Sequence, residues 1–475
     1  MTVVTPGIVP ASALTDAGPP PWLAAWGAFA ARTRFEDLPP EVVGRCKLVL
    51  LDTIGAVAAG MQEPELRALV VRLAGYGAEG DTPAIGAGRR LPAPSAALAN
   101  GAAGTVLELD EGNQYARGHP AIHVVPAALA VAGRIGAAGR DLLLAVALGY
   151  EVGARIGIAS KLRPTMHPHG TWGTVGAALA VAKLHGAGAG GLIEAVNLSS
   201  CLGLTTSRRT MLEGGTVRNA YAGLSNQLGM LAWDLVAAGF TGERDGVGTV
   251  YGTVVADRFE PEAMDADLGG RWEIARNYFK RHAACRYTHA ALDALAEIVA
   301  QAGGRLDPGQ IRGIEVDTYV WAAQLDLAAP PNMLAAKFSL PFALATAVVH
   351  GRADVDAFRD PARADPVVRA LARRVAVRED PALTALLPRL RPARLRVTLA
   401  DGRVLAAEAM VNKGDAEDPY DPDDIGRKFL ELAGPVWGEG HARRVAQAVD
   451  ALDAAADMRA LDGLLAAPPR VGEGA

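Results

Sequence analysis

Three carboxylates and two imidazoles lie within sixteen consecutive residues, between two apolar runs that are rich in alanine. They are Glu108, Asp110, Glu111, His119 and His123. Imidazole titrates near pH 6.5, so a histidine can accept or release a proton at neutral pH, and a neighbouring carboxylate can orient it. This stretch therefore predicts acid–base chemistry. The alternative is a solvated connector whose acids cap the next helix.

Three more groups of titratable residues follow at the edges of helices that are rich in small side chains. They are His167-Pro168-His169, Arg218-Asn219, and segment 280–289 with Lys280, Cys285, Arg286 and His289. Four such groups in one chain indicate one shared pocket. Each later group also has a simpler interpretation: a turn before a helix, a surface ion-pair partner, residues at a domain boundary, or a cysteine that acts as a small buried hydrophobe.

The chemistry that these side chains allow is removal of a proton next to a carboxylate. That step builds negative charge on the carboxylate oxygens, so the site needs a base near neutrality and fixed cations around those oxygens. His119 and His167 are suitable bases or acids, and Arg218, Lys280 and Arg286 are suitable anchors. Elimination of water, loss of carbon dioxide and epimerisation share this carbanion-like intermediate, so the residues alone leave the reaction open.

Two other classes of function fit the same residues less well. The histidines and nearby acids could bind zinc or iron, but the spacing of His167 and His169 is a poor ligand signal and no helical motif supplies a second carboxylate. We therefore expect no metal and no cofactor. A non-catalytic helical binding protein would carry apolar residues, rather than titratable ones, in the four groups.

Composition excludes several kinds of partner. The chain of 475 residues is long enough for two domains with sizeable cores. Its formal net charge of -5 comes without a basic block, which argues against nucleic acid. No uninterrupted apolar run reaches the eighteen or so residues that a membrane span needs. A small anionic molecule remains the expected partner.

The cysteines and the N-terminus predict a cytoplasmic protein. Cys46, Cys201 and Cys285 are far apart in the sequence and form no C-x-x-C pair, which fits a reducing compartment. Segment 1–21 has neither Lys nor Arg and no continuous apolar core. We interpret it as a flexible arm and not as a signal peptide.

Hydrophobic periodicity predicts a mostly α protein with a large all-helical domain and a smaller α+β lid domain. Helical spacing extends over 22–59 with a break at Pro39-Pro40, and helices are expected over 96–106, 124–135, 140–158, 172–185, 192–204 and 220–238. Alternation over 311–319 predicts a strand, and 394–410 predicts a hairpin with a primed turn at Asp401-Gly402. The expected divisions are an arm (1–21), a helical domain (22–274), the lid (275–412) and C-terminal helices that pack back on the helical domain (413–475).

Several short motifs occur in an order that resembles the MmgE/PrpD family. They are Leu51-Asp52-Thr53-Ile54-Gly55, the acidic loop before His119-Pro120, Gly149-Tyr150-Glu151-Val152, His167-Pro168 before Gly173, Gly239-Phe240-Thr241-Gly242, Lys337-Phe338-Ser339-Leu340-Pro341-Phe342, and Lys413-Gly414-Asp415 with Lys428-Phe429. The resemblance covers about residues 22 to 435. It implies a helical domain with a smaller α+β lid, a homodimer, no metal, and a pocket between the domains.

The resemblance also implies roles for single residues. His119 and His167 match the two active-site histidines, and Lys280 matches a family lysine. The family's acidic motif, Asp-x-Asp-Asp-Thr/Ser, lies over 108–112, so its first Asp becomes Glu108 and its hydroxyl residue becomes Gly112. A family lysine becomes Arg218, a site His or Glu becomes Cys285, and a tyrosine becomes Phe342.

Together these matches predict catalytic roles for Glu108, Asp110, His119 and His167. They predict substrate binding by Glu111, His169, Arg218, Lys280, Cys285, His289 and Phe342. The family includes 2-methylcitrate dehydratases, cis-aconitate decarboxylase and an iminodisuccinate epimerase. The resemblance therefore implies a metal-independent lyase of a small di- or tricarboxylate, with dehydration first, epimerisation second and decarboxylation third.

Overall fold

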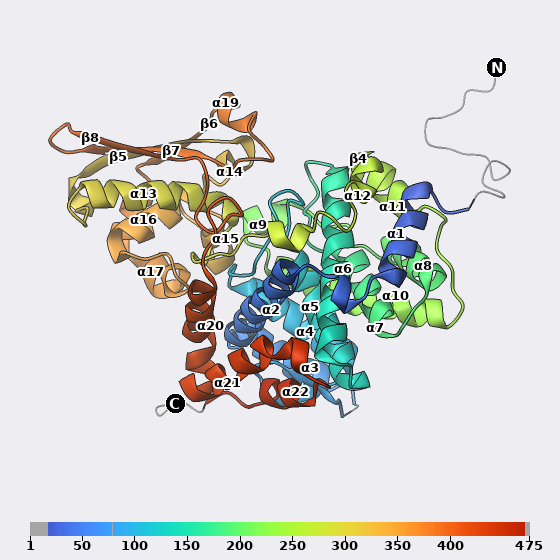
Figure 1. Cartoon of the computed structure of the whole chain (residues 1–475). Coiled ribbons are helices and arrows are strands. Elements are labelled where there is room, and N and C mark those ends of the chain that lie inside the picture. Colours follow the sequence, from blue (N-terminus) through green and yellow to red (C-terminus); the bar gives the residue numbers. More distant parts are fainter. Residues whose placement is uncertain (1–17, 78, 471–475) are drawn as a thin grey trace, which may run out of the picture.

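The computed structural model describes residues 18–77 and 79–470 (Figure 1). Most of the predicted arm, residues 1–17, lies outside this part. The first helix, α1, spans Pro21–Arg32 and packs on α8 (Ala189–Ser200). Proline suits this first helical position because its missing N–H has no helical acceptor there.

A bundle of long helices forms the body of the protein, as predicted. Its members are α2 (Pro40–Gly60), α4 (Ala93–Val106), α5 (Pro120–Ile135), α6 (Gly139–Ala159), α7 (Gly173–Leu184) and α10 (Tyr221–Ala237). Small residues bring these helices together: a Cβ at Gly149 would lie 2.6 Å from the carbonyl oxygen of Gly176, and one at Gly101 would lie 2.7 Å from the Cα of Gly223. Such close backbones hold the loops at the helix ends in fixed positions.

The helical domain is not purely helical, which differs from the prediction. It contains two short antiparallel ladders, β1 (Thr82–Ala84) with β2 (Arg89–Leu91), and β3 (Ser160–Leu162) with β4 (Ala256–Phe259). Strands of three or four residues are too short to show the apolar/polar alternation by which a strand is predicted from sequence. Its shorter helices are α3 (Pro64–Ala74), α9 (Arg209–Glu213), α11 (Gly246–Thr249), α12 (Glu262–Asp265) and the 3₁₀ helix η3 (Thr216–Ala220).

A four-stranded sheet with helices on one face forms the α+β domain (Figure 1). Its order is β6 (Val375–Glu379), β5 (Ile311–Thr318), β7 (Ala393–Leu399) and β8 (Val404–Ala409), with β5 and β6 parallel and the other pairs antiparallel. Helix α13 (His289–Gln301) packs on β7 and β8, and α16 (Leu340–His350) packs on α13. The other helices here are α14 (Val320–Ala323), α15 (Met333–Lys337), α17 (Asp360–Ala364), α18 (Pro366–Ala372) and α19 (Pro381–Thr384).

The turn between β7 and β8 is not of the predicted primed type. The N–H of Gly402 donates to the carbonyl of Leu399 at 3.1 Å, so Ala400 and Asp401 are the central residues. Only Gly402 has a positive φ, of 89°, whereas a type I′ turn needs positive φ at both central residues. The loop is therefore a type I turn followed by a glycine in the left-handed region.

The C-terminal helices lie against the helical domain (Figure 1). Helix α20 (Pro422–Trp437) runs along α2, and α21 (Glu439–Asp450) and α22 (Arg459–Leu465) follow. Gly55 lets α20 approach, since a Cβ there would lie 3.0 Å from the Phe429 ring. Lys428 Nζ donates to Asp52 Oδ1 at 2.6 Å, so a buried ion pair joins the two helices.

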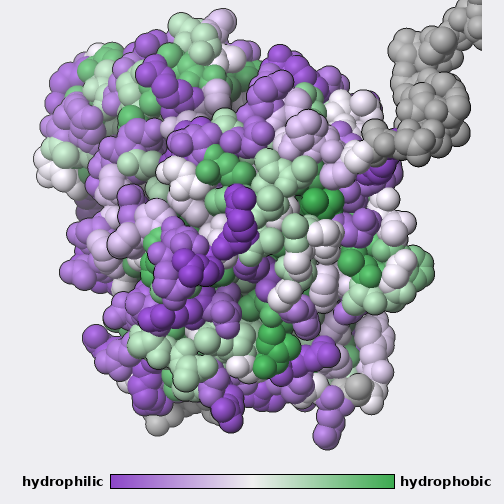
Figure 2. Space-filling model, turned by 45° about the vertical axis from the view of Figure 1, so that its right-hand side comes forward, coloured by the Kyte–Doolittle hydropathy of each residue, from purple (hydrophilic) through white to green (hydrophobic). Residues whose placement is uncertain are grey.

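One helix, α6, is long and apolar enough to cross a membrane by length and composition. The helix predicted over 140–158 corresponds to α6, but Glu151 and Arg155 interrupt its apolar run, so a search for an uninterrupted run does not select it. In the fold, 94% of its most apolar window is buried, and Arg155 Nε donates to Glu151 Oε1 at 2.7 Å. It is a core helix here, and on the face in Figure 2 hydrophobic residues form small separate groups among hydrophilic ones.

Candidate active site

The acidic loop between α4 and α5 is joined to the chain segment that enters the α+β domain. Gly112 and Tyr278 exchange two backbone hydrogen bonds, of 3.0 and 2.7 Å. This pairing places Lys280, two residues beyond Tyr278, against the loop. Glu108 has a φ of 56°, a region that residues other than glycine seldom adopt, and its side chain is buried.

Two cations neutralise the carboxylates of this loop. Arg218 Nη1, from η3, pairs with Glu108 Oε1, and Lys280 Nζ lies 3.6 Å from Glu108 Oε2 and 3.5 Å from Asp110 Oδ1. All four side chains are no more than 2% exposed. Buried charges need partners of this kind. The two carboxylates and the two cations therefore balance each other before any ligand binds.

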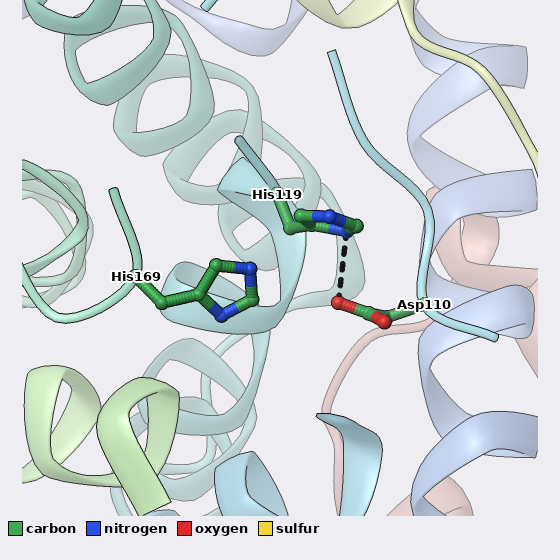
Figure 3. A group of neighbouring side chains, drawn as sticks. All are labelled: Asp110, His119 and His169. Carbon is green, nitrogen blue, oxygen red and sulfur yellow. Dashed lines mark ion pairs between the residues drawn. The ribbon is translucent and has the colours of Figure 1, made fainter. Parts of the chain in front are cut away.

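His119 is oriented for use as a base. Its Nδ1 lies 2.9 Å from Asp110 Oδ2 (Figure 3). The same nitrogen lies 2.6 Å from the carbonyl oxygen of Glu111. A carbonyl oxygen can only accept, so Nδ1 carries the hydrogen and Nε2 keeps a free lone pair. Burial raises the pKa of Asp110, but attraction by His119 and Lys280 outweighs it and holds that pKa below its ordinary value. Asp110 thus stays ionised beside the ring.

His167 has the opposite tautomer. Its Nδ1 accepts the backbone N–H of His169 at 3.0 Å, so the ring hydrogen of the neutral form is on Nε2. Burial, followed by repulsion from Arg218 and Arg208, lowers the pKa of His167 well below its ordinary value. A neutral imidazole with Nε2–H is a hydrogen-bond donor. His119 and His167 therefore offer the site one acceptor and one donor.

His169 lies among the other imidazoles. Its ring centroid is 4.7 Å from that of His119, 4.9 Å from that of His123 and 5.0 Å from that of His167. Both of its ring nitrogens are buried without a hydrogen-bond partner in the described chain. His123, by contrast, bonds the His119 carbonyl at 2.7 Å and accepts from Gly170 N at 3.2 Å, so it is a structural residue.

These groups meet at a cavity of about 40 Å³ between the helical and α+β domains. Six of the predicted site residues line it, and Asp110 and Lys280 contact members of its wall. The four groups of titratable residues thus converge, as the sequence predicts. The predicted residues in the wall are Glu108, His119, His167, His169, Arg218 and Cys285.

Both halves of the sequence match one family of proteins. Residues 25–256 match the MmgE/PrpD N-terminal domain, and residues 282–454 match the MmgE/PrpD C-terminal domain. The chain belongs to the MmgE/PrpD family. The helical domain, the α+β domain and the cavity between them are the arrangement that the family resemblance implies.

The chain is similar along its length to proteins from two species of Aspergillus. The chain is 24% identical over 472 residues to a cis-aconitate decarboxylase of Aspergillus terreus, covering 93% of this chain and 95% of that protein. It is 25% identical over 461 residues to the cis-aconitate decarboxylase-like protein oryM of Aspergillus oryzae (strain ATCC 42149 / RIB 40), covering 90% and 94%. These likenesses span nearly the whole of both chains.

Glu111, predicted to bind substrate, instead points into the helical core. Its Oε1 accepts the N–H of Ala121 at 2.8 Å in the first turn of α5, and its Oε2 accepts from the Tyr150 hydroxyl at 3.1 Å. Burial raises the pKa of Glu111 to about 8. Asp110 faces His119 and Glu111 faces the core because adjacent side chains of an extended loop point to opposite sides.

The buried Glu111 makes stability depend on pH. Between its ordinary pKa of 4.5 and the folded value of about 8, the folded protein holds a proton that the unfolded chain has released. The free energy of unfolding should therefore fall with rising pH in this window, by about 1 kcal/mol per pH unit. Glu111→Gln, which mimics the protonated acid, should remove this component in urea unfolding at pH 5 to 8. The exposed Glu431→Gln is the control, and an equal slope in Glu111→Gln and wild type would contradict the assignment.

His289 and Phe342 are also absent from the cavity wall. His289 Nδ1 contacts Arg286 Nη1 at 3.1 Å, so it helps to hold a wall residue. Phe342 is buried and packs on Phe358 with ring centroids 5.9 Å apart, inside the α+β domain. The phenylalanine in the wall is Phe338, whose ring centroid lies 5.2 Å from the guanidinium carbon of Arg218. It precedes the predicted position by four residues and lies between α15 and α16.

Gly112, which replaces the family's hydroxyl residue, makes room for Tyr278. A Cβ at Gly112 would lie 2.4 Å from the Tyr278 hydroxyl oxygen. Tyr278 lines the cavity, and burial raises the pKa of its hydroxyl above the ordinary value. A neutral tyrosine therefore supplies a hydroxyl to a site that has lost one from the acidic loop.

Cys285 lines the cavity as a neutral thiol. Burial, followed by repulsion from Glu108, raises the pKa of Cys285 to about 11. The thiolate is the nucleophilic form of cysteine, so this residue is not prepared for covalent catalysis. It occupies the position of a family His or Glu as a small, weakly polar part of the wall.

Several cavity residues escaped sequence reasoning because each is an ordinary residue in a loop. They are Arg117, Arg208, Tyr278, Tyr287 and Arg391. Arg286, proposed from sequence as an anchor, is in the wall and pairs with Asp415 at 2.5 Å. The Lys413-Gly414-Asp415 motif thus holds Arg286 in the wall. This motif was the one sequence feature that indicated this part of the site.

One group of described residues could hold a metal ion: Asp110, His119 and His169, with ligand atoms within 4.8 Å of one another (Figure 3). The surroundings oppose a cation, because Lys280 Nζ is 3.5 Å from Asp110 Oδ1 and Arg218 pairs with the neighbouring Glu108. Like charges at such distances repel strongly where water is excluded.

Activity should therefore survive removal of divalent metals. We expect dialysis against EDTA to leave turnover within about twofold of the untreated protein, within the scatter of ordinary assays. The measurement is the initial rate before and after dialysis, with metal content read by mass spectrometry. A loss of rate that added zinc or iron restores would show that the three residues form a metal site.

Proposed function

We propose that this protein is a metal-independent lyase of small polycarboxylates that acts by proton transfer at a carbon next to a carboxylate. One observation carries the proposal: His119 Nε2 as acceptor and His167 Nε2–H as donor share a cavity with Arg218, whose walls come from both domains. An acceptor, a donor and fixed cations are what a developing carbanion and its carboxylate require.

Decarboxylation is the first candidate reaction, in place of the dehydration that the sequence ranked first. The named relatives support it, since they are a cis-aconitate decarboxylase and a cis-aconitate decarboxylase-like protein, each aligned over 90% or more of this chain. In this reaction the bond from carbon to the leaving carboxylate breaks, its electron pair stays on carbon, and carbon dioxide departs. A proton from an imidazole, replaced from water, then completes the new C–H bond. The cations stabilise the remaining carboxylates during the charge shift.

Dehydration of a hydroxy acid is the second candidate, supported by the opposite tautomers of the two histidines. Elimination needs a base for the α-proton and a separate acid for the leaving hydroxide. His119 Nε2 can accept the proton, and His167 Nε2–H can donate to the departing oxygen. The C–H electron pair becomes the new double bond, and water leaves.

A panel of acids in deuterium oxide tests both candidates. We would incubate the protein with cis-aconitate, citrate, 2-methylcitrate and iminodisuccinate, and follow each by proton NMR. A decarboxylase gives an acid with one carboxylate fewer and deuterium at the protonated carbon, whereas a hydro-lyase gives an unsaturated acid. Replacement of the α-proton by deuterium without a new compound in the spectrum would indicate an epimerase. A panel with no exchange and no product would overturn the proposal.

We further propose that the protein is a cytoplasmic homodimer. The family resemblance supports the dimer, and the absence of paired cysteines supports a reducing compartment. Sedimentation equilibrium of the purified chain tests the dimer. Fractionation of the source cells tests the compartment.

A further inference from the structure

Three arginines in and beside the cavity have no carboxylate partner in the described part of the chain. They are Arg117, Arg208 and Arg391, and none of them takes part in an ion pair of 4.0 Å or less. The other cations of the wall are matched, Arg218 by Glu108 and Arg286 by Asp415. The unmatched positive charge is thus concentrated at one side of the site.

Arg208 is the least satisfied of the three. Its Nε and Nη1 are buried and have no hydrogen-bond partner, although a guanidinium carries five N–H donors. Its guanidinium carbon lies 4.3 Å from the centroid of the Trp321 ring, which fixes the plane of the group. Buried donors without acceptors are costly, so this arrangement calls for an acceptor that the chain does not supply.

Arg117 and Arg391 line the same void, and backbone carbonyls hold both side chains. Arg391 Nη2 donates to the Gln114 carbonyl at 2.7 Å, and its guanidinium lies 5.4 Å from the centroid of the Tyr287 ring. Arg117 Nη2 donates to the Ser160 carbonyl at 3.2 Å. Carbonyl oxygens orient these groups without cancelling their charge.

Two further voids share wall residues with the small cavity. A void of about 60 Å³ shares Arg117, Arg208 and Tyr287 with it, and an outer cavity of about 290 Å³ shares Arg117, Arg391 and Tyr287. A cavity of 40 Å³ has room for about three water molecules, which is less than a whole polycarboxylate needs. The remainder of a bound acid therefore has further space next to the three arginines, in voids whose walls these residues share.

We propose that Arg208, with Arg117 and Arg391, forms a second anion subsite that binds the distal carboxylate of the substrate. This inference rests on the proposed function, and it narrows the substrate class to extended acids with two carboxylates separated by a chain. One carboxylate lies by His119 and Arg218, and the other lies at Arg208. The geometry also makes Arg208 a specificity residue, since it contributes nothing to acids with one carboxylate.

Binding of unreactive saturated acids tests the subsite without any turnover. We would measure dissociation constants by calorimetry for the diacids from succinate to pimelate and for the monoacids of equal chain length. At one chain length the diacid should bind at least about tenfold more tightly than its monoacid, which corresponds to about 1.4 kcal/mol at 25 °C. In Arg208→Gln this ratio should fall to between about one and two, with monoacid binding unchanged.

Two variants make the test specific to Arg208. Arg208→Lys keeps the charge and should retain part of the diacid preference. Arg209→Gln changes the next residue, whose exposed side chain pairs with Glu213 at 2.5 Å, and should match the parent protein. Circular dichroism and thermal melts would show that each variant is folded.

The possible outcomes separate the two proposals. A diacid-to-monoacid ratio near one at every chain length, or an equal loss of both affinities in Arg208→Gln, overturns the subsite. A clear diacid preference together with no deuterium exchange in any acid overturns the proposed reaction and leaves the subsite standing. A diacid preference that is lost in Arg208→Gln, partly kept in Arg208→Lys and unchanged in Arg209→Gln supports it.

Discussion

Replacing His119 with glutamine should lower kcat by about a thousandfold, because general acid–base groups contribute on the order of a hundredfold to ten-thousandfold. The glutamine amide keeps a polar group near the place of Nε2, but it has no donor at the place of Nδ1, which bonds the Glu111 carbonyl at 2.6 Å. Its amide oxygen is a very weak base, so the variant loses the basic lone pair of Nε2. The measurement is the steady-state rate on the acid that the NMR panel identifies.

His185→Gln is the matched control for this change. His185 is also an imidazole on the helical domain, but it is partly exposed and stacks on Trp233 with centroids 5.8 Å apart. The His185→Gln variant should have the same kcat as the wild-type protein. A diacid dissociation constant in His119→Gln within about threefold of the parent value would show that the pocket is intact. Turnover of His119→Gln within a few-fold of wild type would remove His119 from the mechanism.

The sequence predicted those parts of the site that local chemistry marks. The acidic loop is visible because carboxylates seldom interrupt apolar helices, and the long helices are visible because their apolar spacing is regular. The bundle is thus largely predictable. The short ladders β1–β2 and β3–β4 are not, since their few residues gain strand structure only from the pairing partner.

The remaining errors concern the direction in which side chains point. Asp110 and Glu111 are neighbours of the same chemical type, yet one faces His119 and the other caps α5 inside the core. Phe338 and Phe342 are four residues apart, on either side of the start of α16, and only the first reaches the wall. Arg208 and Arg391 are indistinguishable in sequence from surface arginines. Only the packing of two domains against each other brings them to the cavity.

Lys428→Met should destabilise the protein by about 3 to 5 kcal/mol, the usual cost of leaving one member of a buried ion pair alone. Lys428 donates to Asp52 Oδ1 and to the Leu109 carbonyl, both at 2.6 Å, and both charged side chains are no more than 4% exposed. Burial raises the pKa of Asp52 and lowers that of Lys428, so each depends on the other for its charge. Urea unfolding measures the loss.

An exposed pair with the same chemistry provides the control. Lys413 Nζ lies 2.7 Å from Asp418 Oδ1, with side chains 46% and 52% exposed, and Lys413→Met should change stability by less than about 1 kcal/mol. An equally small change in the free energy of unfolding for Lys428→Met would show that the buried ion pair stabilises the protein no more than the exposed one.

The double variant Asp52→Asn/Lys428→Met separates stability from positioning. With both charges removed, no uncompensated ion is buried, so most of the lost stability should return. The Leu109 carbonyl still lacks its donor, however, and Leu109 lies between Glu108 and Asp110 in the acidic loop. Turnover should therefore stay low after stability has recovered. If stability and turnover both recover in the double variant, α20 supports the fold but does not orient the acidic loop.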